Sequence, residues 1–418
     1  NTLEVRALVG HGAHPDVLAQ AGAAQADILI AVTLYDEVNM IACQVAHSLF
    51  NVPTKIARIR RGPYLQPQYQ KLFSHDDVPV DVVISPEAEA GDMVLRRLAL
   101  APGVDILYFL DEEVVALAVQ CIENCPILNT SLRELNALFP DLQSTVVSVE
   151  REGEIMLAKS STQLRVGDLA YVLTPKDKVT RSLALFGYKE EHFSRLVIAG
   201  GGNIGLHVAR GLEKRLEKSY VKLIESNQER AHLISDELPH TTVLHGSALD
   251  LALLQEAEIE KADLFLGLTN QDQVNVLSAI IAKRIGCKAN MVLLNNSIYK
   301  TLGPKFGIDA YLDPRVLTVS RILQYMRAGR IRSIYSVANG AAELIESEVM
   351  PHSPLIGKAL ADLHLPEGIR IGAIYRKGEF IQPQGNSILR VQDCIVSCVL
   401  TRYYKDLAPF FHIHSEYL

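Results

Sequence analysis

The chain has 418 residues and a mass of 46.1 kDa, more than one hydrophobic core usually holds, so we expect several domains. Hydrophobic residues make up 48% of it and charged residues 21%, an ordinary globular composition that excludes disordered, collagen-like and coiled-coil classes. The net charge of −7 argues against nucleic acid as a partner. No apolar run is long enough to span a bilayer, and the 6 cysteines suit a reducing compartment better than a disulfide scaffold.

Three segments recur in the same order, which indicates two copies of one unit. HGAHPD at His11 recurs as HGSALD at His245, TLYDEVN at Thr33 as TNQDQVN at Thr269, and GEIMLAKSSTQLRVGD at Gly153 as GEFIQPQGNSILRVQD at Gly378. A repeat of this length fixes the architecture. Each copy has a larger and a small module: we expect the larger modules at residues 1–84 and 192–314, and the small modules at 103–187 and 328–413.

The first larger module begins with Thr2–Val9, which the repeat aligns with the third strand of the second copy. The counterpart of residues 196–234, with a glycine loop and an acidic residue, is absent from the first copy. Strands three to five alone would leave an exposed sheet edge and an uncovered apolar face. This favours a truncated or disordered N-terminus over a domain that has lost its first half, and it leaves nucleotide binding by the first copy open.

Arginines follow the fifth strand of this module at Arg58, Arg60 and Arg61. Alternate residues of an extended chain face the same side, so Arg58 and Arg60 can bind phosphate together. A solvent-exposed basic edge is the evenly weighted alternative. Asp36, and Asp272 in the second copy, are expected in the first turn of a helix rather than at a ligand.

Two pairs of cysteines are spaced closely enough to be considered as metal ligands. Cys121 and Cys125 lie in a predicted helical run of the first small module, and Cys394 and Cys398 in a predicted strand of the second. Neither pair has a second pair nearby to complete tetrahedral zinc coordination. Buried thiols are therefore predicted, and no metal site.

The second larger module alternates strands with helices, which predicts a doubly wound α/β fold: a Rossmann-like parallel sheet with helices on both faces. Its predicted strands are Leu196–Ala199, Val221–Ile224, Thr242–Leu244, Asp263–Leu268 and Met291–Leu294, and its clearest helices are Leu251–Glu260 and Val274–Ile285.

A G-x-G-x-x-G motif follows the first of these strands and opens a helix. The first glycine permits the turn, the second allows a pyrophosphate to approach, and the third allows close packing of helix on strand. Glu225, at the end of the next strand, can accept hydrogen bonds from an adenine ribose and would repel a 2′-phosphate, which favours NAD or an adenine nucleotide over NADP. A nucleotide-free glycine turn is the less favoured alternative. The candidate residues are Ala199, Gly200, Gly201, Gly202, Asn203, Gly205 and Glu225.

Further loops belong to the same edge of the sheet, because the carboxyl ends of parallel strands bind the ligands of this fold. The candidate residues there are Gly246 and Ser247 after the third strand, Thr269 and Asn270 after the fourth, and their first-copy counterparts Thr33 and Leu34.

The second small module reads as α+β. Strands are predicted at Ile331–Val337, Ile369–Tyr375 and Cys394–Leu400, a tight turn at Lys377-Gly378, and a short helix from Ser353. No candidate catalytic cluster occurs in either small module.

The motifs together resemble a known family. HGAHPDVLAQAG, DEVNMIACQVAHSLFNVPTKIARIR and VIAGGGNIGLHVAR are similar to the TrkA family, the peripheral regulatory subunits of bacterial Trk potassium-uptake systems. The resemblance runs along the whole chain and includes the tandem order of nucleotide-binding and C-terminal modules, the RCK (regulator of potassium conductance) domains.

The resemblance implies a homo-oligomer, a tetramer in the family, at the cytoplasmic face of the bacterial inner membrane. It implies docking on a membrane-embedded Trk potassium-translocating subunit, with NAD(H) and, in some members, ATP or ADP as ligands. It places the dinucleotide loop on Gly200 to Asn203 with Gly205, the ribose acid on Glu225, and phosphate contacts on Arg58 and Arg60.

An NAD-dependent oxidoreductase is the alternative function. Such an enzyme needs an acid or base opposite the nicotinamide and a residue that orients the substrate. The small modules offer neither at a suggestive spacing, and a duplicated module is what a symmetric assembly would use. A regulatory, non-catalytic role is therefore predicted.

Overall fold

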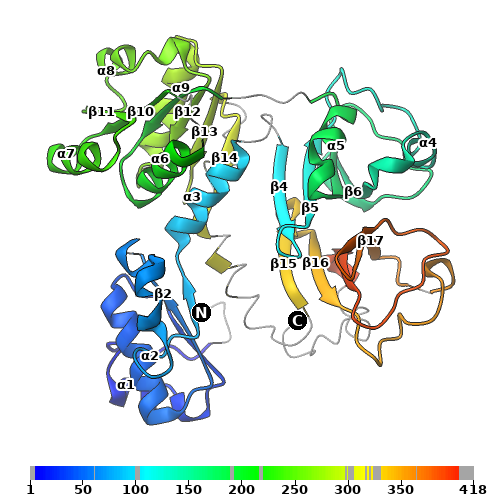
Figure 1. Cartoon of the computed structure of the whole chain (residues 1–418), viewed down its shortest axis with the longest axis horizontal. Coiled ribbons are helices and arrows are strands. Elements are labelled where there is room, and N and C mark those ends of the chain that lie inside the picture. The colour runs from blue at the N-terminus through cyan, green and yellow to red at the C-terminus, as the bar shows by residue number, and fades with distance from the viewer. Residues whose placement is uncertain are drawn as a thin grey trace. The chain divides into compact units, whose positions relative to one another are not determined.

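The structure is a computed structural model (Figure 1), and it describes residues 5–60, 62–98, 104–188, 193–215, 220–296, 299, 306–315, 318–319, 322, 331–363 and 365–403. The chain divides into two compact units, Asn1–Leu95 with Phe193–Ile322 and Arg96–His192 with Leu323–Leu418. The first unit thus combines the two larger modules and the second the two small ones. In the described part of the chain, no helix is both long and apolar enough to cross a membrane.

The second larger module is a parallel sheet with the strand order β11-β10-β9-β12-β13-β14. Its central strands are buried along their length, because crossover helices cover both faces. Strand β9 lies between β10 and β12, so its carboxyl end is the switch point of the sheet. The strands are β9 (Arg195–Ala199), β10 (Tyr220–Glu225), β11 (Thr241–His245), β12 (Leu264–Gly267), β13 (Ala289–Leu293) and β14 (Ala310–Leu312). The helices are α6 (Asn203–Arg215), α7 (Gln228–Glu237), α8 (Leu251–Glu256), η6 (Ile259–Lys261) and α9 (Asp272–Ile285).

All five predicted strands of this module are present, and the doubly wound class is confirmed. The sixth strand, β14, was missed because it is only three residues long and lacks an alternating pattern. The predicted helix from Leu251 is shorter than expected. It ends at Glu256 because Glu258 adopts a left-handed conformation (φ 55°), after which a separate 3-10 turn forms.

The first larger module has three parallel strands in the order β1-β2-β3, which correspond to β12, β13 and β14. The prediction of a strand at Thr2–Val9 is wrong for its described part: residues 5–9 form no strand, and Val5 and Val9 are exposed. The equivalent strand β11 is an edge strand that pairs with β10, whereas within the described part of the chain no strand pairs with residues 5–9. The elements are α1 (Pro15–Gln20), η1 (Ala23–Gln25), β1 (Ile28–Ala31), α2 (Asp36–Phe50), β2 (Thr54–Arg58), η2 (Gly62–Leu65), η3 (Pro67–Phe73), β3 (Val82–Ile84) and α3 (Pro86–Arg97).

Helix α3 joins the two larger modules, since it follows β3 and packs alongside α6 (Figure 1). The Oδ1 atom of Asp92 lies 2.8 Å from Nε2 of His207. A Cβ atom on Gly91 would overlap His207, and one on Gly211 would overlap Leu95. The two helices therefore approach closely at glycine positions.

The two small modules are five-stranded antiparallel sheets with the same topology, β4-β5-β8-β6-β7 and β15-β16-β19-β17-β18. Phe109 and Leu173 of the first share one buried cluster with Ala373 and Val396 of the second, so the sheets pack against each other. The first module has β4 (Val104–Phe109), β5 (Val114–Gln120), α4 (Leu132–Leu138), η4 (Pro140–Leu142), β6 (Thr145–Arg151), β7 (Glu154–Leu157), β8 (Leu169–Pro175), η5 (Lys176–Lys178) and α5 (Val179–Leu185). The second has β15 (Ile331–Val337), η8 (Ala338–Gly340), β16 (Ala342–Glu348), η9 (Leu360–Asp362), β17 (Ile369–Arg376), β18 (Glu379–Ile381), β19 (Cys394–Leu400) and η10 (Thr401–Tyr403).

Two local predictions in the small modules are wrong. No α-helix follows Ser353, because Gly357 adopts a left-handed conformation (φ 81°) and Ala359 pairs with Ile388 in an isolated bridge. The segment between Cys121 and Cys125 is a turn after β5 rather than a helix. The burial of the thiols is confirmed: all six cysteines are free and buried.

Candidate functional site

The glycine loop connects β9 to α6 at the switch point of the second larger module. Gly200 adopts a left-handed conformation (φ 106°), and a Cβ atom there would lie 2.9 Å from the backbone nitrogen of Thr269. A Cβ atom on Gly205 would overlap the carbonyl oxygen of Gly200, so this glycine lets α6 pack on the end of β9. Gly202 differs, because a Cβ atom there would meet nothing within 4 Å. The fold therefore requires the first and third glycines, whereas the second keeps space open in front of the helix N-terminus, where an anion is favoured.

Glu225 ends β10 and faces the glycine loop. Its Oε2 atom accepts the Gly201 N–H at 2.7 Å, and Oε1 accepts the Asn227 N–H at 2.8 Å. The two backbone donors hold the carboxylate beside the loop. The structure thus brings the predicted ribose acid and the predicted phosphate loop together.

Arg230 on α7 also contacts the loop, although the sequence interpretation missed it. Its Nε donates to the Gly201 carbonyl at 3.0 Å. Gly201 is therefore held through its N–H by Glu225 and through its carbonyl by Arg230. Burial and the nearby Arg230 lower the pKa of Arg210 on α6. An arginine five residues after a strand-ending acid was the only available signal.

The loop after β11 lies next to Glu225. Gly246 donates its N–H to the Glu225 carbonyl at 2.9 Å and has a φ of 152°. A Cβ atom on Gly246 would lie 2.8 Å from a terminal methyl group of Leu253, and this positive φ is one that other residues rarely adopt, so the turn favours a glycine. The Ser247 hydroxyl accepts the N–H of Leu249 at 3.2 Å, which gives Ser247 a role inside its own turn.

A buried asparagine holds the loop after β12. Asn275 accepts the Thr269 N–H at 2.9 Å and the Thr269 hydroxyl at 2.6 Å through Oδ1. Its Nδ2 donates to the carbonyls of Thr269 and Leu293. The first copy repeats this network: Asn39 bonds the N–H and hydroxyl of Thr33 and the Arg58 carbonyl. The recurring T-x-x-D-x-x-N motif is thus a clamp that joins two neighbouring strand ends.

The acidic residue of that motif has a related role. Asp36 begins α2 and accepts the Arg60 N–H with both oxygens at 3.0 Å. Asp272 begins α9 and accepts the N–H groups of Asn295 and Asn296. Their predicted placement in the first helical turn is confirmed. Each carboxylate neutralises the positive helix end and fixes the loop after the next strand.

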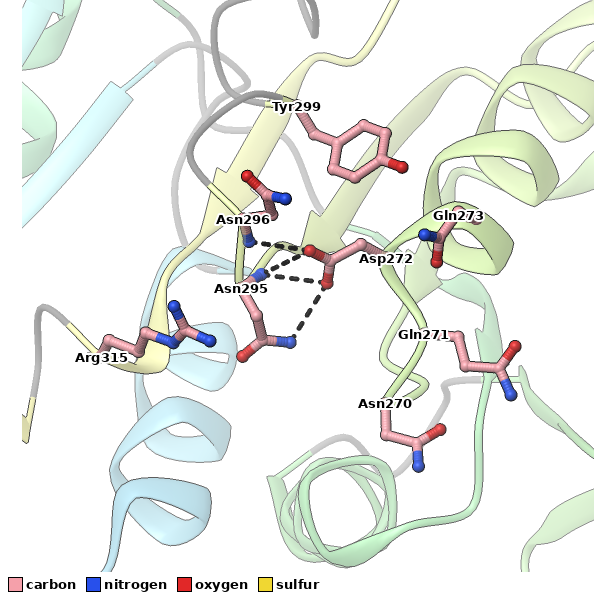
Figure 2. A pocket seen from close by; sticks show the side chains of 8 residues that line it. All are labelled: Asn270, Gln271, Asp272, Gln273, Asn295, Asn296, Tyr299 and Arg315. Carbon is pink, nitrogen blue, oxygen red and sulfur yellow. Dashed lines mark hydrogen bonds between the residues drawn. The ribbon is translucent and has the colours of Figure 1, made fainter.

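A pocket of about 510 Å³ opens beyond this loop (Figure 2). Amide side chains dominate its lining, Arg315 is its one cation among the described residues, and Asp272 is engaged by the backbone of Asn295 and Asn296. The lining residues are Asn270, Gln271, Asp272, Gln273, Asn295, Asn296, Tyr299 and Arg315. Of the predicted residues, only Asn270 lines this pocket.

The arginines of the first larger module have an acidic partner that the sequence interpretation did not include. Arg58 contacts Oε1 of Glu87 at 3.2 Å through a terminal nitrogen, and Arg60 contacts the same oxygen at 2.8 Å through Nε. Leu34, in contrast, is 69% exposed. The Asn203 amide, at the start of α6, lies 3.4 Å from the Arg60 carbonyl, so the two sets of predicted residues meet.

The described residues include no cluster of three or more His, Cys, Asp or Glu side chains arranged for a metal ion. The open space at Gly202, the N-terminus of α6 and the carboxylate of Glu225 instead fit the pyrophosphate and ribose of an adenine nucleotide.

Comparison with known proteins places these features in a family. The TrkA-N domain family matches residues 1–86 and 196–314, and the TrkA-C domain family matches residues 344–396. The chain is 49% identical over 415 residues to the Trk system potassium uptake protein TrkA of Azorhizobium caulinodans, covering 99% of this chain and 91% of that protein. It is 37% identical over 416 residues to the protein of the same name from Halomonas elongata, covering 98% and 90%.

Among solved structures, the GsuK channel superposes with a TM-score of 0.60 at 17% identity, over 97% of this chain and 70% of that chain. A structure described as the GsuK RCK domain gives a TM-score of 0.58 at 17% identity, over 96% and 84%. These likenesses support a fold of tandem RCK domains, and the sequence relatives extend along almost the whole chain. The chain therefore belongs to the TrkA family of Trk system potassium uptake proteins.

Proposed function

We propose that this chain is a nucleotide-binding regulatory subunit that controls potassium uptake by a membrane-embedded Trk subunit. The observation that carries the proposal is the glycine loop: its first and third glycines are required by packing, whereas a Cβ atom on Gly202 would meet no atom of the described residues within 4 Å. A glycine without a structural need, at the N-terminus of a helix and beside a carboxylate, is what a bound pyrophosphate and ribose would require.

The second larger module binds NAD(H) in this proposal. The phosphates meet the loop from Ala199 to Asn203 with Gly205, and Glu225 accepts hydrogen bonds from the adenine ribose. Gly246, Ser247, Thr269 and Asn270 complete the edge around the ligand. The NAD-bound GsuK channel, a neighbour in fold with a TM-score of 0.58, is consistent with a dinucleotide here.

The first larger module provides Thr33, Leu34, Arg58 and Arg60 for a phosphorylated ligand, for which ATP and ADP are the candidates. Arg58 and Arg60 face the same oxygen of Glu87, so their guanidinium groups already converge. Convergent guanidinium groups suit a phosphate group better than a single lysine would.

The chain works in this proposal as a homo-oligomer, a tetramer by family expectation, on the cytoplasmic face of the inner membrane. Nucleotide binding gates transport only if one conformation of the assembly binds the ligand better than another, because equal affinity would shift no equilibrium. The larger modules therefore sense the ligand, and the paired small modules belong to the assembly that responds.

The test is co-purification with the membrane Trk subunit, followed by potassium flux in proteoliposomes with NADH, ATP and ADP compared. We expect flux to depend on nucleotide, and the dependence on NADH to disappear in Gly202→Val. Flux that is the same with and without this chain would contradict the proposal. Light scattering that gives a 46.1 kDa monomer at working concentration would contradict its oligomeric part.

A further inference from the structure

The carboxylate of Glu87 occupies the place between the two arginines of the first larger module. One oxygen, Oε1, accepts from Arg58 at 3.2 Å and from Arg60 at 2.8 Å. Glu87 lies in the first turn of α3 and its side chain is only 12% exposed. A carboxylate in this place is an anion that the chain itself supplies to the proposed phosphate site.

This ion-pair cluster is incompletely satisfied. Nε of Arg58 and Oε2 of Glu87 are both buried, and neither has a hydrogen-bond partner within the described part of the chain. Buried donors and acceptors are normally paired, and an unpaired one costs desolvation free energy. A phosphate has three oxygens and could satisfy the Nε of Arg58 as well as the groups that Glu87 already engages.

The second larger module has the same strand ends, but it carries a basic residue at the position that Glu87 occupies in the first. Ile59 donates to Ile84, and Leu294 donates to Leu312, so the two strand ends align residue by residue. By that alignment Glu87 corresponds to Arg315. Where the first module has a filled ion-pair cluster, the second has an open, amide-lined pocket (Figure 2). An acid at this place is therefore not a requirement of the fold.

We infer that Glu87 is an internal competitor for the anion site, which a ligand phosphate must displace from Arg58 and Arg60. The inference rests on the phosphate-binding role proposed above for the two arginines. Displacement frees the first turn of α3, whose later turns pack on α6 through Asp92 and His207. Helix α6 starts at the glycine loop, so binding at the first module is transmitted to the nucleotide site of the second.

The test measures anion binding in Gly202→Val chains, in which the second site is silenced, by calorimetry with ATP and with inorganic pyrophosphate. Glu87→Gln keeps a neutral acceptor for Arg60 but removes the competing charge. The affinity of this variant for both anions should rise about tenfold or more. The substitution weakens the charged hydrogen bonds between residue 87 and the arginines in the ligand-free protein, but it leaves the phosphate–arginine bonds of the complex unchanged. Glu37→Gln is the matched control: Glu37 is an exposed acid in the first turn of α2 and touches neither arginine, so it should change affinity less than twofold.

A second measurement follows α3 by hydrogen exchange. ATP should accelerate exchange at the amides of residues 88–90 of the parent, the first two of which bond to Ser85, whereas Glu87→Gln should exchange quickly there with and without ATP. A thermal unfolding curve close to that of the parent shows that the variant is folded.

If Arg60→Ala weakens anion binding, the arginines form an anion site. If Glu87→Gln then binds the anions no more tightly than the parent, Glu87 is not a competitor for that site. Absence of binding in both the parent and Glu87→Gln would overturn the arginine site and the competitor together. Tighter binding without any change at α3 would overturn the transmission to α6.

Discussion

Replacing Gly202 by valine separates ligand binding from folding at the glycine loop. A Cβ atom at this position meets no protein atom within 4 Å, and the backbone there is not left-handed, so the free protein should fold as before. The added methyl groups would fill the space in front of the α6 N-terminus. Loss of two charge-assisted hydrogen bonds from the pyrophosphate, at about 1.5–3 kcal/mol each, would weaken NADH binding more than about a hundredfold.

Gly205→Ala, three residues further along and inside α6, is the matched contrast. Its Cβ atom would overlap the Gly200 carbonyl oxygen, so α6 must move by about 1 Å or more to restore ordinary contact. Overpacking of this kind costs about 1–3 kcal/mol, and alanine regains up to about 1 kcal/mol of helix propensity. We expect a fall in Tm of about 4 °C for each net kcal/mol in a domain of this size.

Calorimetry with NADH and thermal unfolding of both variants complete the experiment. Gly202→Val should lose affinity at unchanged Tm, whereas Gly205→Ala should lose both. Unchanged NADH affinity in Gly202→Val would show that no pyrophosphate lies on this loop. A large loss of Tm in the same variant would show that the space around Gly202 is not open.

Asn275→Ala should destabilise the second larger module by about 2–4 kcal/mol, because it removes a fully buried side chain that pairs with the partly buried Thr269 N–H and the buried Leu293 carbonyl. Denaturant unfolding measures the loss, and a value below about 0.5 kcal/mol would contradict the clamp. For Asp263, burial alone would raise the pKa, but Lys288 and the N–H groups of Arg195 and Ser194 lower it to about 2. A carboxylate with a depressed pKa stabilises the fold above its unfolded pKa near 4, and the contribution of about 2 kcal/mol disappears as the pH falls toward 2. Asp263→Asn should therefore flatten the acid limb of the stability curve, and identical acid limbs in both proteins would refute the assignment.

The repeat and the glycine motif make much of the second larger module predictable from the sequence. Buried parallel strands are continuous apolar runs, and a glycine motif between a strand and a helix has few structural solutions. The strand expected at Thr2–Val9 shows the limit of the same reasoning. Its residues have strand character, but a strand exists only where a neighbouring strand supplies hydrogen bonds.

The roles of individual residues were harder to predict from the sequence than the fold, because these roles depend on tertiary contacts. Asn39 and Asn275 occupy equivalent positions of the sequence repeat. That each joins two strand ends is known only from the structure, in which their amides bond the carbonyls at the end of the neighbouring strand. No sequence pattern marks Glu87, and the only signal for Arg230 is its place five residues after an acid that ends a strand. Each acts on a group far away along the chain, Glu87 on two arginines of β2 and its following loop and Arg230 on Gly201.

The amino-acid sequence alone determined the duplication, the alternation of strands and helices, and the glycine loop, because these depend on local periodicity and on comparison of the chain with itself. The tertiary structure decided which glycine serves the fold and which leaves room for a ligand. It also decided that the two arginines meet a carboxylate of the chain rather than solvent. Such choices depend on atoms brought together from distant segments, and no local pattern records the distance between them.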